Sequence, residues 1–80
     1  MPKICIPIKK EEKDEMISLL SAIEATAETK NQTFNWYLTK SDIENYDYIA
    51  VIKVKTINRA HKIGLLITKK YRKKGYYWIK

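Results

Sequence analysis

The stretch Tyr48-Ile49-Ala50-Val51-Ile52-Lys53-Val54-Lys55-Thr56 supports two interpretations that lead to different folds. Its β-branched residues favour a strand. A helix also fits, because side chains recur at helical spacing from this stretch into the next, and Gly64 would then end the helix. The recurring positions are Ile49, Ile52, Thr56, Ala60 and Ile63.

The segments before this stretch predict a strand and then a long helix. Residues Lys3 to Ile8 alternate in polarity, although Pro7 confines such a strand to an edge or an end. Acidic residues then fill a first helical turn, and apolar residues recur at helical spacing from Lys10 to Thr29. These are Met16, Leu19, Leu20, Ile23 and Ala27.

The middle of the chain is less regular. A polar break precedes Phe34 to Leu38, which could form a strand or lead into a second helix. Ser41 and Glu44 have the spacing of a capping box, which predicts a short helix from Ser41 to about Tyr48.

The end of the chain predicts a basic β-hairpin. Residues Leu65 to Tyr71 and Gly75 to Ile79 are strand-like, and the turn between them would be Arg72-Lys73-Lys74-Gly75. With a basic helix before it, this hairpin would form one unit with a cationic tip.

The segment Lys55-Thr56-Ile57-Asn58-Arg59-Ala60-His61-Lys62-Ile63-Gly64-Leu65-Leu66 resembles the recognition helix of the winged helix-turn-helix family. The resemblance implies an α+β winged-helix fold in which this helix enters the major groove of DNA and the C-terminal hairpin is the wing. Its residue-level part covers residues 55–79.

The resemblance implies a set of DNA-binding residues on the basic helix and the wing. Asparagine can pair with adenine edges and arginine with guanine edges, whereas lysines neutralise phosphates without reading sequence. The implied residues are Lys53, Lys55, Thr56, Asn58, Arg59, Lys62, Lys69, Lys70, Arg72, Lys73 and Lys74.

The rival architecture is one long N-terminal helix packed on an antiparallel sheet, with Ile57 to Lys62 as a loop. Lys53 and Lys55 would then share a face, and Tyr76 and Trp78 on one face could stack single-stranded bases. The same basic face could also dock on an acidic protein, as an inhibitor does. The strands would be Lys3 to Ile8, Phe34 to Leu38, Tyr48 to Thr56, Ile63 to Tyr71 and Tyr76 to Lys80.

Composition excludes several classes of site. Eighty residues make a single domain, residues 1–80. One cysteine, one histidine and two glycines exclude a disulfide framework, a Cys-rich zinc site, a two-histidine site and a Gly-rich phosphate loop. We expect no metal, no cofactor and no catalytic residue. His61 could act as a general acid or base in a small ribonuclease, but a surface or phosphate-contacting histidine is the simpler expectation.

The charges are divided unevenly along the chain. Residues 1–47 hold six lysines and all nine acidic residues, whereas residues 48–80 hold ten basic residues and no acidic one. Such asymmetry indicates a polyanionic partner. We expect a non-catalytic nucleic-acid-binding protein of the cytoplasm, with double-stranded DNA as the first partner and a transcriptional regulator as the first hypothesis. An acidic protein or single-stranded nucleic acid is the alternative, a homodimer is compatible, and no membrane partner is expected.

Overall fold

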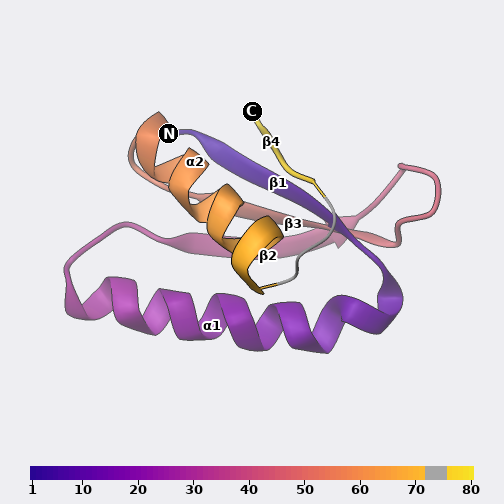
Figure 1. Cartoon of the computed structure of the whole chain (residues 1–80), viewed down its shortest axis with the longest axis horizontal. Helices are drawn as coiled ribbons and strands as arrows, with labels where there is room; N and C mark the ends of the chain where they lie inside the picture. Colours follow the sequence, from indigo (N-terminus) through magenta and orange to yellow (C-terminus); the bar gives the residue numbers. More distant parts are fainter. Residues whose placement is uncertain (72–75) are drawn as a thin grey trace.

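The computed structural model describes residues 1–71 and 76–80, and the side chains of all of these except Lys70 and Tyr71. In chain order the elements are strand β1 (Lys3–Ile8), the 3-10 turn η1 (Lys10–Glu12), helix α1 (Lys13–Thr29), strands β2 (Asn35–Lys40) and β3 (Tyr48–Lys53), helix α2 (Ile57–Leu65), its π-helical continuation η2 (Leu66–Tyr71) and strand β4 (Trp78–Ile79). The chain is therefore α+β (Figure 1).

The strands form one antiparallel sheet in the order β2-β3-β1-β4. With a helix after β1 and another after β3, this connectivity is the split βαβ, or ferredoxin-like, arrangement. The first and last strands are neighbours, and Lys3 and Lys80 exchange backbone hydrogen bonds beyond β4. The two ends of the chain consequently lie close together (Figure 1).

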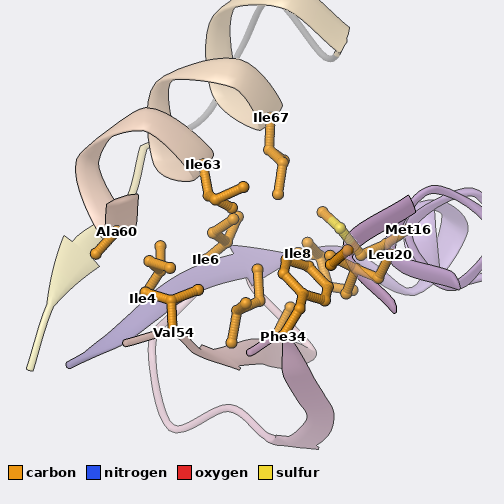
Figure 2. Packing of buried hydrophobic residues seen from close by; sticks show 13 residues of the cluster. Ile4, Ile6, Ile8, Met16, Leu20, Phe34, Val54, Ala60, Ile63 and Ile67 are labelled. Carbon is orange, nitrogen blue, oxygen red and sulfur yellow. The ribbon is translucent and has the colours of Figure 1, made fainter. Parts of the chain in front are cut away.

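The core lies between one face of the sheet and the two helices. Alternation along β1 points Ile4, Ile6 and Ile8 to this face, and all three are fully buried. Figure 2 shows Ile63 and Ile67 pointing toward β1 from α2 and η2. Helix α1 contributes Met16, Leu20 and Ala27 to the same cluster, and β3 contributes Ala50 and Ile52.

The ambiguous stretch divides into a strand and the start of a helix. Residues Tyr48–Lys53 form β3, which pairs with β1 on one side and β2 on the other. The expectation of a basic helix running back through Ile49 was therefore wrong, because a central position gives β-branched side chains partners on both sides. The rival expectation of a loop over Ile57 to Lys62 was also wrong. Thr56 caps α2 there, its hydroxyl accepting a hydrogen bond from the Arg59 N–H at 3.2 Å.

The predicted C-terminal hairpin does not form, and its first limb is helical. Residues 66–71 continue α2 as η2, so the strand predicted over Leu65 or Ile63 to Tyr71 was wrong. Ile67 is buried in the core, and the Thr68 hydroxyl donates to the Gly64 carbonyl at 2.8 Å. Trp78–Ile79 instead pairs with β1. The turn predicted over residues 72–75 lies outside the described residues.

Gly64 was also expected to end the helix, and that expectation was wrong. It lies inside α2, where a Cβ atom would come within 2.6 Å of the Tyr77 ring. The glycine is therefore needed for close packing and not for a left-handed cap.

The remaining differences concern element ends. The long helix is confirmed, and Asn31 ends it with a positive φ of 54°. The N–H groups of Asn31 and Gln32 bond back to the carbonyls of Glu28 and Ala27, which is the Schellman pattern. The short helix predicted from Ser41 was wrong, because the Ser41 hydroxyl accepts from the Ile43 N–H and closes a local turn. No helix in residues 1–71 or 76–80 is long and apolar enough to cross a membrane.

Candidate nucleic-acid interface

The strand positions that alternate with the core positions form the second face of the sheet, which we call the open face. Three buried side chains make its apolar floor, namely Cys5, Pro7 and Val51. Around them lie polar, aromatic and basic residues. Strand register assigns to this face Lys3, Cys5 and Pro7 of β1, Asn35, Tyr37 and Thr39 of β2, Ile49, Val51 and Lys53 of β3, and Trp78 of β4, with Lys80 and Tyr76 continuing the alternation.

A row of three lysines crosses the open face. Lys53 lies opposite Lys3 in the β1–β3 pair, and Lys3 lies opposite Lys80 beyond β4. Directly opposed residues on neighbouring strands have Cβ atoms only about 5 Å apart, so like charges there destabilise the sheet. No acidic residue occupies a strand position on this face of the described sheet. The lysine row thus costs the free protein stability.

Aromatic rings lie beside the lysine row. In the next register row, Tyr37 and Trp78 stand on the two edge strands, with Val51 and Cys5 between them. The Lys53 Nζ lies 5.8 Å from the centroid of the Tyr37 ring, a distance within the range of a cation–π contact. Tyr37 is 45% exposed, so one face of a base could reach it.

A second aromatic group on the open face includes Trp78 of β4 and residues that precede β4 in the chain. The rings of Tyr76 and Trp78 have centroids 6.0 Å apart and planes tilted by 31°. Tyr46, from the turn before β3, contacts Tyr76 edge-on at 6.0 Å. The expectation that Tyr76 and Trp78 share one side is therefore confirmed, and Tyr76 is 45% exposed.

The electrostatics around Cys5 agree with this placement of the lysines. Burial raises the pKa of the Cys5 thiol, while the positive charges of Lys80 and Lys3 act in the opposite direction. The thiol is buried, and the two charges that act on its pKa belong to the lysine row.

The DNA-binding residues expected from the sequence do not lie on one surface. Lys53 belongs to the open face, whereas Lys55 follows the end of β3, so the two do not share a strand face as expected. Thr56 is occupied as the cap of α2. Lys69 is exposed on η2. Arg72, Lys73 and Lys74 and the side chain of Lys70 lie outside the described residues.

Helix α2 presents a separate exposed stripe. Asn58 is exposed, and so are His61 and Lys62, which follow it by three and four residues and therefore lie on the same side of the helix. Arg59 is half-buried and lines the space between α2 and α1. The structure therefore separates the expected basic helix into an outward stripe and an inward arginine.

His61 contacts Tyr77, the residue just before β4. Its Nδ1 lies 3.1 Å from the Tyr77 hydroxyl, and the two rings meet edge-on. Over residues 1–71 and 76–80 no group of three His, Cys, Asp or Glu side chains has the geometry of a metal site.

Sequence reasoning missed four contributors to the open face, namely Lys3, Tyr37, Tyr46 and Lys80. The alternation of β1 and β2 contained a signal for the first two. The positions of Tyr46 and Lys80 depend on which strand pairs with β1, and a sequence of this length gives no local sign of that partner.

No protein-family model, curated protein or solved structure was found that matches this chain.

Proposed function

We propose that this protein binds single-stranded nucleic acid on its open face, without catalysis. The observation that carries the proposal is the Lys53–Lys3–Lys80 row beside Tyr37 and Trp78. Lysines neutralise phosphates, and aromatic rings stack on bases of any sequence. A polyanion bound on the row would offset the repulsion among the lysines.

The arrangement of the face favours a flexible strand over a duplex. A sheet presents separate aromatic rings on which unstacked bases can stack. In a base-paired duplex the bases are stacked on one another and cannot reach such rings. An acidic protein could satisfy the lysines, but it would leave the exposed Tyr37 and Tyr76 without a specific role. The aromatic rings therefore favour bases over a protein partner.

The primary test is fluorescence anisotropy with a labelled 12-nucleotide DNA or RNA strand and the duplex of the same sequence, over a series of salt concentrations. We expect the single strand to bind more tightly. Three lysine–phosphate contacts on a single strand predict a log–log salt slope of about −2. Tighter binding of the duplex at every salt concentration would contradict the proposal.

A matched pair of variants separates the open face from general basicity. Lys53→Gln and Lys62→Gln remove the same charge, one from the lysine row and one from the outside of α2. We expect Lys53→Gln to weaken single-strand binding and to reduce the salt slope by about 0.7, and Lys62→Gln to change binding little. Equal losses in both variants would mean that the open face is not the binding surface.

The free protein offers an independent readout of the same row. Because Lys53 faces Lys3 directly, Lys53→Gln should raise the free energy of unfolding at low salt by about 0.2–1 kcal/mol. Urea denaturation measures this. A gain in stability together with a loss of binding is the combination that a functional lysine row predicts.

Substitution of the exposed aromatic residues tests whether these rings stack on bases. Tyr37→Ala and Tyr76→Ala should each weaken binding by about 1–3 kcal/mol, since one stacked base is lost. In a Trp36→Phe background Trp78 is the one remaining tryptophan, and its fluorescence should change when the strand binds. Unchanged Trp78 emission at saturation would contradict its placement in the site.

A second candidate is duplex DNA binding by α2. This is the function that the winged-helix resemblance implies. The exposed stripe of Asn58, His61 and Lys62 favours this candidate. Asn58→Ala and Lys62→Gln should then weaken duplex binding while Tyr37→Ala leaves it unchanged, which is the reverse of the outcome expected for the open face.

A further inference from the structure

A groove runs between α1 and α2, on the opposite side of the sheet from the lysine row. It has a volume of about 380 Å³, which lies in the range of pockets that take small molecules. Its apolar lining includes Leu19 and Ile23 from α1, Ile63 from α2 and Leu66 from η2.

The charges in the groove are of one sign. Among the described residues, Arg59 and Lys30 are the charged ones in its lining, and no carboxylate lines it. The Arg59 Nε is buried and has no hydrogen-bond partner among the described residues. The two terminal nitrogens of this guanidinium are not enclosed in the same way, and because the group stays charged at every physiological pH, they are the donors that an anionic acceptor in the groove could meet.

The burial of the Nε atom also restricts where the Arg59 side chain can lie. That atom is enclosed, the residue as a whole is half-buried, and Arg59 lines the groove. A carboxylate is the acceptor that fits a guanidinium best, through charge-assisted hydrogen bonds.

We propose that this groove binds a small apolar monocarboxylate, with its hydrocarbon part against the leucine and isoleucine side chains and its carboxylate at Arg59. Charge complementarity selects the carboxylate over a neutral or cationic amphiphile of the same length. The site is independent of the open face and does not need nucleic acid.

The test titrates ¹⁵N-labelled protein with octanoate, octanol and octylammonium and follows amide chemical shifts. Octanoate should perturb amides of α1 and α2 around the groove and bind about tenfold more tightly than octanol, with octylammonium weakest. Shifts that are equal for the three compounds, or that lie outside the groove, would overturn the proposal without any variant being needed.

Variants then locate the carboxylate. Arg59→Met keeps an apolar side chain in the groove but removes the charge, so octanoate should bind about tenfold more weakly and octanol as before. Lys62→Met, on the same helix but outside the groove lining, is the matched control and should bind octanoate like the wild type. Unchanged octanoate affinity in Arg59→Met would overturn the assignment. Lys53→Gln should leave octanoate binding intact, which keeps this result separate from the test of the open face.

Discussion

Gly64 of α2 packs against the ring of Tyr77 in the C-terminal segment. A Cβ atom on residue 64 would lie 2.6–2.8 Å from three atoms of the Tyr77 ring. The ring cannot swing away freely, because its hydroxyl is bonded to His61 and residue 78 is already paired in β4. At this position a helix interior accepts glycine in spite of its poor helix propensity, since packing outweighs propensity.

Gly64→Ala should therefore lower the free energy of unfolding by about 1–3 kcal/mol through overpacking, although alanine favours helix by about 1 kcal/mol. Urea denaturation measures the change. In a Tyr77→Leu background the same substitution should be neutral or stabilising, because the ring is gone. An equal loss in both backgrounds would show that the Tyr77 ring is not the cause.

Thr56 matters at the scale of an element, because it marks where β3 ends and α2 begins. Its backbone is extended, and its hydroxyl accepts the Arg59 N–H that the first helical turn leaves without a partner. The sequence contains this signal, a threonine just before the helix. The helical spacing of apolar residues also runs through Thr56. That spacing makes Thr56 resemble a residue inside a helix, so the capping signal is easily missed.

Thr56→Ala should destabilise the protein by about 1 kcal/mol, and Thr56→Ser should cost only a small part of that because serine also caps. Thermal or urea unfolding followed by circular dichroism compares the two. Equal losses for alanine and serine would mean that the hydroxyl does not carry the effect.

At the scale of the whole molecule, one core joins the sheet to both helices. Ile6 is fully buried at its centre, between β1 and the helices, whereas Ile57 at the start of α2 is 59% exposed. Every described element except η1 places a residue in this core or packs one directly against it, so unfolding should be cooperative.

Ile6→Ala should cost about 2–5 kcal/mol, a large fraction of the stability of a small domain, whereas Ile57→Ala should change it by less than about 1 kcal/mol. In a Trp78→Phe background the fluorescence of Trp36 reports on β2, and far-ultraviolet circular dichroism reports on the helices. The two probes should give the same unfolding midpoint in each variant. Separate midpoints would contradict a single core.

Folding also changes which charged residues are neighbours, compared with their order along the chain. The described basic residues of the second half occur on β3, between β3 and α2, on α2 and η2, and after β4, so they lie on different sides of the molecule. The lysine row needs Lys3 from the acidic half to be complete. A charge count along the sequence therefore indicates a polyanionic partner, but it does not show which charges the fold brings together.

The amino-acid sequence by itself determined the α+β class, strand β1, helix α1 and the exclusion of several kinds of site. These features rest on local patterns, namely alternation, helical spacing and composition, which do not depend on distant residues. Only the tertiary structure decided that residues 48–53 form a central strand, that residues 66–71 extend a helix and that β4 pairs with β1. The reason is that a β-branched stretch such as 48–53 can become strand or helix until neighbouring strands supply its hydrogen bonds. One of those strands, β1, lies 40 to 50 positions away in the sequence.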